Sequence, residues 1–565
     1  MDTSRDIRPP SPLHDAVLQH LPLEDPIALR RCLVKLHCLV NSTVPINTLP
    51  AEVLAEILRF ARLRRPPHWS FTTVLLVCHH WYDIAISWPS LWSDITIAMP
   101  LRILEVYSSR SRGAGLSLTT QGGRTAIGAP PDALLRALSP HFHRVAQLDT
   151  CSSQPWIEHR MEQLSSLIVN DDIINPLARF APARSQVITL AGDRFPRLES
   201  LILRQLRVQV NLANLRSLTS LTMERVSHAS WNALLVALSS CPALQYLEID
   251  SPKVHSVTFP THGNSDVIKL RYLRGLILDH FDEHSGLSFL LAHLYLPRAA
   301  KIAISTDMGE GHDLVTGGFN ELSTLIADTI PVNKTFLPVF SAIRDVQVTV
   351  SSPRLQVVVS TPKEAPASTP STSFALSCTL RDRWNTRAVQ EQIMLELPMV
   401  FPASLSTLHI CVKDDDDGNY YGPYGVNLAE VWRGLYDAFP QIEDLCLGGP
   451  NAIFFDDFLG DFGPGASLQH LPLPWPKLKR VWFEYTATAD GALLGGPDES
   501  MRIILAITTT MCNRRDAASA EPLQHLTVIL PTLGVQVGMC LSRLRSTTQK
   551  LVVRDIRGQG IVLEN

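Results

Sequence analysis

The acidic run "KDDDDGNYYG" at residues 413–422 is the first stretch whose residue types could do chemistry. Clustered carboxylates bind Ca²⁺ when they occupy fixed positions of a loop of about twelve residues with glycine at its sixth position. With Gly418 at that position, the first ligand would be Lys413 and the twelfth would be Tyr424. Neither side chain supplies a carboxylate. We therefore interpret the run as a solvated acidic loop and predict no metal site there.

Other short motifs lack the partners that their chemistry requires. "DFG" at residues 461–463 would indicate a kinase only with a glycine-rich loop and an H-R-D loop, and neither occurs. His79 and His80 are adjacent, and adjacent residues of a helix point in different directions, so they cannot share one metal ion. The sequence also lacks a phosphate-binding P-loop, G-x-S-x-G and H-E-x-x-H. We expect no catalytic residues, no metal, no cofactor and no enzymatic activity.

The composition narrows the class of protein further. The chain has 565 residues, 45% of them hydrophobic, and a net charge of −4, so it lacks the basic excess typical of nucleic-acid-binding proteins. Its ten cysteines include no C-x-x-C pair and lie mostly in apolar runs, which is typical of buried, reduced thiols. No signal peptide and no uncharged apolar stretch of about 18 residues occur. We predict a protein of the cytoplasm or nucleus, or both, that binds neither nucleic acid nor membrane.

From about residue 94 the sequence contains short β-type segments that share one pattern. Each has apolar residues at positions i, i+3 and i+5, and a degenerate copy begins at Val145. Many copies have a proline two or three residues before the first apolar position, and helical segments precede some of them. The first positions of the copies are Leu164, Leu198, Leu218, Leu244, Leu273, Ala299, Ile343, Leu405, Ile442, Leu478 and Leu523.

The pattern predicts a repeated unit of a helix, a proline-containing turn and a short strand. Residues i+3 and i+5 of a strand point to the same side, where the helix can cover them. Such units bury their apolar faces against their neighbours, so the sequence indicates an α/β fold with an irregular leucine-rich-repeat solenoid, with helices outside and short parallel strands. The spacing varies from about 19 to about 62 residues, whereas regular repeats keep to about 20–29. An ordinary doubly wound α/β domain remains an alternative.

The chain is predicted to have four parts. Residues 1–12 are polar and proline-rich and are expected to be disordered, and residues 13–45 form an N-terminal helical segment. Residues 46–97 form a small helical module, and residues 98–565 form the repeat array. Within the array, residues 360–373 are rich in Pro, Ser and Thr and are expected to be a disordered insertion between two strands.

The stretch "INTLPAEVLAEILRFARL" opens the small helical module. Pro50 suits a first helical turn, where its missing N–H would be unpaired anyway, and the helix dipole favours Glu52 there. The helix carries two adjacent apolar stripes, which is more than one core-facing stripe requires. These stripes are Val53, Ile57 and Phe60, and Leu54, Leu58 and Ala61. The surplus apolar surface predicts an interface with another protein.

The module as a whole resembles the F-box motif in the form common in mushroom-type fungi. The resemblance covers about 50 residues, and the array that follows resembles the degenerate leucine-rich region of that family more loosely. The matching residues are Leu49-Pro50, Glu52, Val53, Leu54, Ile57 and Leu58, followed by Val77-Cys78, Trp81, Ile84-Ala85, Pro89, Leu91 and Trp92.

The resemblance implies a substrate adaptor of a ubiquitin ligase. Its helices would bind the Skp-type adaptor of a cullin-RING ligase, and its array would hold an unknown substrate protein. The expected adaptor-binding residues are Leu49, Pro50, Val53, Leu54, Ile57 and Leu58, whereas Trp81 and Trp92 are expected to brace the helices. Two alternatives stay open. One is an interaction scaffold without ligase coupling, whose N-terminal helices cap the array. The other is a hydrolase or transferase with an α/β domain.

Overall fold

The computed structural model has a mixed α/β fold with a large, mostly parallel sheet. The chain divides into two compact units, of which the first contains residues 1–150 and 154–164 and the second contains residues 151–153 and 165–565. The structure describes residues 25–63, 71–97, 99–119, 131–151, 155–170, 187–206, 209–228, 230–254, 267–281, 284–297, 300–308, 326–327, 329–351, 354–360, 373–380, 386–413, 428–449, 475–485, 497–516, 523–530, 532–533 and 537–564.

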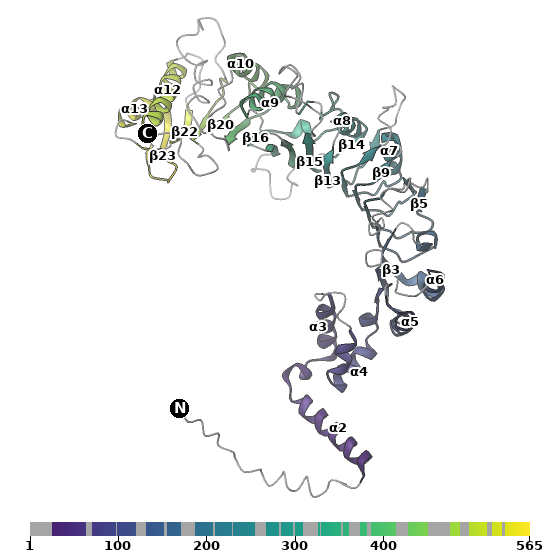
Figure 1. Ribbon diagram of the computed structural model, residues 1–565. Helices are drawn as coiled ribbons and strands as arrows, with labels where there is room; N and C mark the ends of the chain where they lie inside the picture. The colour runs from purple at the N-terminus through teal and green to yellow at the C-terminus, as the bar shows by residue number, and fades with distance from the viewer. Residues whose placement is uncertain are drawn as a thin grey trace, which may run out of the picture. The chain divides into compact units, whose positions relative to one another are not determined.

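The first unit begins with helices, as predicted, and continues into a parallel three-stranded ladder (Figure 1). Asp25 caps the first described helix by accepting a hydrogen bond from the Ile27 N–H (2.9 Å), and Pro26 occupies its first position. The elements are α2 (Pro26–Ser42), η1 (Pro45–Thr48), α3 (Ala51–Leu63), η2 (Phe71–Leu76), α4 (His79–Ser87), η3 (Pro89–Trp92), β1 (Asp94–Thr96), α5 (Leu101–Arg110), β2 (Leu116–Thr119), α6 (Pro131–Leu138), η4 (Ser139–Arg144), β3 (Val145–Cys151) and η5 (Pro155–Glu158).

Trp92 anchors the core where η3 meets α4 and α5. Its indole N–H donates to the Ala85 carbonyl (2.6 Å), which satisfies the only polar atom of a fully buried ring. The ring makes an edge contact with Tyr107 at 4.9 Å between centroids, and the Arg110 guanidinium lies 4.5 Å from its centroid. The prediction that Trp92 braces the helices is confirmed.

The strands of the second unit pair with their neighbours in nearly the order of the chain. Pairing is parallel except that β17 is antiparallel to both of its neighbours and β24 is antiparallel to β23. In sheet order the strands are β4 (Ser166–Asn170), β6 (Ser200–Arg204), β8 (Ser220–Glu224), β10 (Tyr246–Asp250), β13 (Gly275–Phe281), β15 (Lys301–Met308), β18 (Ser373–Leu380), β17 (Arg354–Ser360), β16 (Asp345–Ser351), β19 (Thr407–Lys413), β20 (Asp444–Gly449), β21 (Arg480–Tyr485), β22 (Leu523–Leu530), β23 (Thr548–Asp555) and β24 (Gly560–Glu564).

The predicted apolar positions of these strands align in register and are buried. The i+3 residues form two continuous rows because each parallel strand repeats the phase of the one before. The first row is Leu167, Leu201, Leu221, Leu247, Leu276 and Ile302, and the second row is Val346, Leu408, Leu445, Val481 and Leu526. The i+5 residues form two further rows beside the first two, and these residues are also buried. The predicted strand positions are confirmed.

The backbone enters successive strands in the same way. The N–H groups of Glu199 and Ser200 both donate to the carbonyl of Ser165, at 2.9 Å each. One strand later, the N–H groups of Thr219 and Ser220 both donate to the carbonyl of Glu199, again at 2.9 Å. The same paired donation recurs at the starts of β10, β13, β19, β20, β21 and β22. The turns that precede these strands therefore have a common geometry, although they are irregularly spaced in the sequence.

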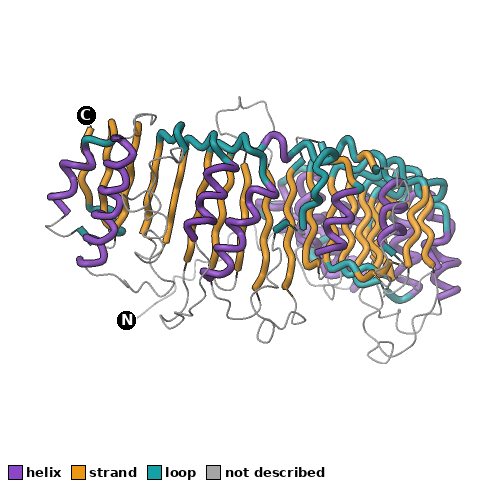
Figure 2. Tube along the Cα trace, turned by 90° about the horizontal axis from the view of Figure 1, so that it is seen from above, coloured by secondary structure: helices purple, strands orange, loops and turns teal. Residues whose placement is uncertain are grey.

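The helices of the second unit lie along one side of this row of strands (Figure 1), and Figure 2 shows the strands standing side by side beside them. Short two-stranded parallel sheets supplement the helices at the N-terminal end of the row. The helices are α7 (Trp231–Ser239), α8 (His284–Ala292), α9 (Thr386–Val400), α10 (Leu428–Ala438), α12 (Pro497–Asp516) and α13 (Val537–Arg545). The short strand pairs are β5 (Val187–Ala191) with β7 (Gln209–Ala213), β9 (Ser227–His228) with β11 (Lys253–Val254), and β12 (Ile268–Lys269) with β14 (Leu294–Tyr295).

Two strands were predicted on either side of the insertion at residues 360–373, and the structure confirms them as β17 and β18. β16 does not pair with β15, because β18 pairs parallel with β15 and β17 lies antiparallel between β18 and β16. The pattern missed β23 near the C-terminus. Its Leu551 and Val553 occupy the i+3 and i+5 positions and are buried in register with β22, but the polar Thr548 occupies position i. The predicted disordered segments, the acidic loop and the "DFG" motif lie largely or wholly outside the described residues.

His228 is a buried histidine whose protonation opposes folding. Burial lowers its pKa from 6.5 to about 4, and its Nε2 has no hydrogen-bond partner among the described residues. The unfolded chain therefore takes up this proton at higher pH than the folded chain does. We expect His228 to cost stability as the pH falls from 6.5 to about 4, by roughly 3 kcal/mol at the acidic end, and to cost nothing above that window.

The measurement is the free energy of unfolding by urea at several pH values. His228→Gln should flatten the curve between pH 6.5 and about 4 relative to the unmodified chain. His79→Gln is the matched control, because the His79 side chain is largely exposed and its loss should change the slope much less. Equal slopes for the unmodified chain and His228→Gln would contradict the prediction.

Candidate docking surfaces

The two apolar stripes of α3 have different environments. Leu54 and Leu58 are 0% and 2% exposed, whereas Val53, Ile57 and Phe60 are 45%, 37% and 54% exposed. The three exposed residues follow one another at helical spacing and form one continuous strip on the helix surface. We call Val53, Ile57 and Phe60 the docking stripe.

The buried stripe forms the core between α3 and α4. Leu54 packs with Ala55 and Ile84, and Ala51, Trp81 and Trp88 lie against this cluster. Leu54 and Leu58 were expected to contact the adaptor, but their burial means that they shape the module from inside and are not accessible to a partner. Of the other expected contact residues, Leu49 is half-buried and Pro50 is exposed at the start of α3.

Asn47 holds the helices of the module together through its side-chain amide. Its Nδ2 donates to the carbonyl of Asn41 at the end of α2 (2.8 Å), and its Oδ1 accepts from the Trp81 indole N–H in α4 (2.6 Å). These two bonds join α2, η1 and α4 at one residue, just before α3 begins. This role could not be predicted from the sequence, because an asparagine outside a regular helix or strand is most often a turn residue.

The docking stripe lies in the part of the chain with the most exposed apolar surface. Roughly half of the large hydrophobic side chains that are exposed among the described residues fall between residues 27 and 82. None of the residues of α2 is buried, and Leu76 and Val77 are exposed between η2 and α4. The exposed apolar residues of α2 are Ile27, Leu33, Val34, Leu36, Leu39 and Val40. Large exposed apolar patches mark interaction sites on water-soluble domains.

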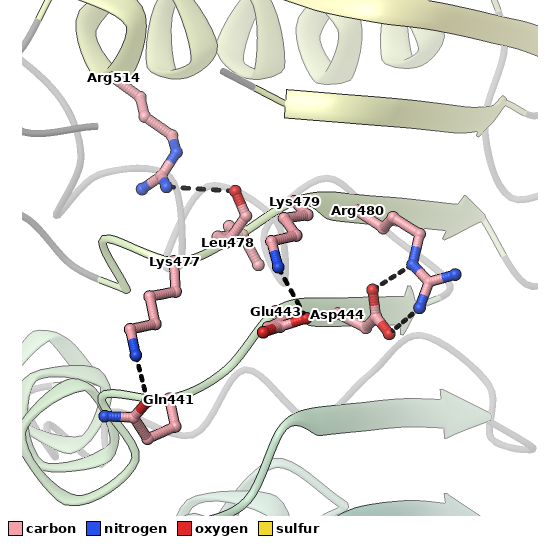
Figure 3. A network of polar contacts seen from close by, with 8 residues as sticks. All are labelled: Gln441, Glu443, Asp444, Lys477, Leu478, Lys479, Arg480 and Arg514. Atoms are coloured by element: carbon pink, nitrogen blue, oxygen red, sulfur yellow. Dashed lines mark hydrogen bonds and ion pairs between the residues drawn. The ribbon is translucent and has the colours of Figure 1, made fainter. Parts of the chain in front are cut away.

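The strand face that points away from the helices is the second candidate surface, and Figure 3 shows its edge at the starts of β20 and β21. Here residues at or just before the start of β20 pair with the equivalent residues of β21, which lie 36 positions later in the chain. The pairs are Gln441 with Lys477 (2.6 Å), Glu443 with Lys479 (3.1 Å), and Asp444 with Arg480 through two bonds. Complementary charges thus link successive strands at this edge.

Metal-binding clusters and membrane-spanning helices were sought among the described residues. No group of three or more His, Cys, Asp or Glu among them could hold a metal ion. No described helix is both long and apolar enough to cross a bilayer. No protein-family model matches the chain, and no curated protein matches it.

Proposed function

We propose that the chain is an F-box-type substrate adaptor. The docking stripe binds the Skp-type adaptor of a cullin-RING ubiquitin ligase, and the second unit binds the substrate protein. One observation carries this proposal: α3 exposes Val53, Ile57 and Phe60 although its other apolar stripe already fills the core. A helix that needed only to fold would have polar residues at those positions.

The same proposal interprets the second unit as an irregular leucine-rich-repeat solenoid. Three observations support it: the chain-order pairing of the strands, the in-register rows of buried residues and the repeated lead-in turn. In a solenoid each repeat contacts only its neighbours, so insertions such as β17 and β18 extend the row without breaking its core. The strand face then offers a long surface for a substrate.

The docking stripe alone is too small for a stable complex. Specific interfaces bury about 1,600 Å² in total, or about 800 Å² on each partner. Three side chains on one helix supply only part of this area. We therefore place Leu76, Val77 and the apolar residues of α2 in the same interface, with Asn47 fixing α2 relative to α4.

The test is co-purification of the full chain with a recombinant Skp-type adaptor. Val53→Glu combined with Ile57→Glu should weaken binding at least about 100-fold, because each complex would bury two carboxylates without partners. The matched control is Ile103→Glu combined with Val106→Glu on α5, since those side chains are 40% and 41% exposed in the same unit. The control pair should bind like the unmodified chain.

A second candidate function is an interaction scaffold without ligase coupling. One observation favours it: the N-terminal helices belong to the same compact unit as β1–β3, and helices that cap the end of a row of strands are expected to do so. In that case the unmodified chain would not bind the adaptor, and the turnover of its partner would be normal in cells that lack the cullin. Adaptor binding that is lost only in the Val53/Ile57 variant supports the first function over the second.

A further inference from the structure

Two apolar side chains stand out on the strand face of the second unit. Tyr246 of β10 and Ile277 of β13 are 53% and 43% exposed, although this face is otherwise lined mostly by polar and small residues of the neighbouring strands. Tyr246 is in register with Gly275, and a Cβ at residue 275 would lie 3.1 Å from the Tyr246 ring. The ring therefore lies over the glycine, and Ile277 is the next outward residue of β13. We call Tyr246 and Ile277 the apolar platform.

A row of carboxylates borders this platform. Glu224 and Asp250 end β8 and β10, and Asp279 lies near the end of β13. The three residues are in register, and neighbouring strands lie about 5 Å apart. Glu248 is in register with Ile277 itself. Like charges opposite one another on adjacent strands are destabilising, so the row costs folding energy that a cationic partner would recover.

The described residues neutralise this row only in part. Arg204 lies 3.4 Å from Glu224, and His280 lies 3.0 Å from Asp250 and 3.6 Å from Asp279. The carboxylate side chains stay between 24% and 36% exposed. These two partners face three carboxylates, and Glu248 adds a fourth, so the named residues of this edge carry net negative charge even when both partners are counted as cations.

The other end of the same face carries a more balanced set of charges. Arg480, His525 and Lys550 are in register on β21, β22 and β23. The pKa of His525 is lowered first by burial and then by Lys550 and Arg480. Arg480 is paired with Asp444, and Lys550 is paired with Glu564, so the basic residues at this end are balanced by carboxylates. The carboxylate row beside the platform is therefore the part of this face that favours a cationic segment of a partner.

We propose that the apolar platform and its carboxylate row bind an extended, basic segment of the substrate protein, with an aliphatic or aromatic side chain next to an arginine or lysine. The inference rests on the proposed function and names the class of substrate that the second unit takes. Ile277 and Asp279 point the same way and lie about 7 Å apart along β13. An extended peptide places residues two apart at the same distance, so an apolar residue followed two positions later by a cation fits both.

The probes are three fluorescent peptides tested with the full chain by anisotropy at low ionic strength. The first repeats Leu-Ser-Arg-Ser, the second replaces arginine by glutamate, and the third replaces leucine by serine. The first should bind at least about tenfold more tightly than either of the others, and added salt should weaken it. Binding of none of the peptides, or equal binding of the first and second, would overturn the proposal.

Variants locate the site. Asp250→Asn combined with Asp279→Asn should weaken the first peptide at least about tenfold, and Ile277→Ser should have a similar effect. Trp482→Ser is the matched control, because Trp482 is an exposed apolar residue on the same face of β21, away from the carboxylate row. Its loss should leave binding unchanged. Loss of binding in the control but not at the platform would place the site elsewhere and contradict the proposal.

The adaptor assay separates this inference from the proposed function. Both platform variants should bind the Skp-type adaptor like the unmodified chain. Their urea unfolding transitions should also match that of the unmodified chain, which shows that the second unit is folded. If the unmodified chain fails to bind the adaptor yet binds the basic peptide through the platform, then ligase coupling is wrong and the binding site is right. If the adaptor binds and the peptides show no preference, then the substrate class is wrong.

Discussion

Leu54→Asp should unfold the α3–α4 module of the chain. Leu54 is 0% exposed and packs against Ala55 and Ile84, so the new carboxylate would be buried without a partner in place of an apolar side chain. Loss of the leucine and burial of the charge together cost roughly 5 kcal/mol or more, which is comparable to the whole stability of a small module. Hydrogen exchange measured by mass spectrometry should show that the amides of α3 and α4 lose their protection.

The matched control is Ile57→Asp on the same helix. Ile57 is 37% exposed, so the same carboxylate there can stay hydrated, and the protection of α3 should be nearly unchanged. Both variants should lose adaptor binding if the proposed function holds, but for different reasons. Leu54→Asp would remove the module, whereas Ile57→Asp would damage only its surface. Retained protection of α3 in Leu54→Asp would contradict the packing described here.

Glu396→Ala should destabilise the second unit by roughly 3–5 kcal/mol. Glu396 lies in α9 and is 1% exposed. Its carboxylate accepts hydrogen bonds from the backbone N–H groups of Ile326 and Ala327 (2.9 Å for Ala327) and from the Gln392 amide (2.7 Å). Alanine would leave two backbone N–H groups near a buried turn without this acceptor. The free energy of unfolding by urea measures the loss.

Glu443→Ala provides the comparison for Glu396→Ala. Glu443 pairs with Lys479 at 3.1 Å, but both side chains are substantially exposed, and such surface pairs contribute at most about 1 kcal/mol. The two substitutions remove the same side chain, so their difference isolates the effect of burial. A loss of less than about 1 kcal/mol for Glu396→Ala would mean that other groups or water replace the carboxylate.

The repeat pattern illustrates how much of this fold the sequence carries. An apolar residue at i+3 and i+5 of a strand is a local property, and a parallel neighbour with the same phase brings these residues into one buried row. Leu247 and Leu445, for example, were both assigned to strands from spacing alone, and both are buried in register with their neighbours. The pattern failed at Thr548, where a polar residue fills an apolar position that packing tolerates.

The sequence by itself determined that α3 has more apolar surface than one core needs and that the later chain forms strands of one phase. Only the tertiary structure decided that Leu54 packs inside while Ile57 faces solvent, because the two residues are equally apolar and the position of α4 selects between them. In the same way, Asp250 and Asp279 lie 29 positions apart in the chain and become neighbours only through the register of β10 with β13. Both outcomes depend on long-range packing, and local residue preferences do not specify it.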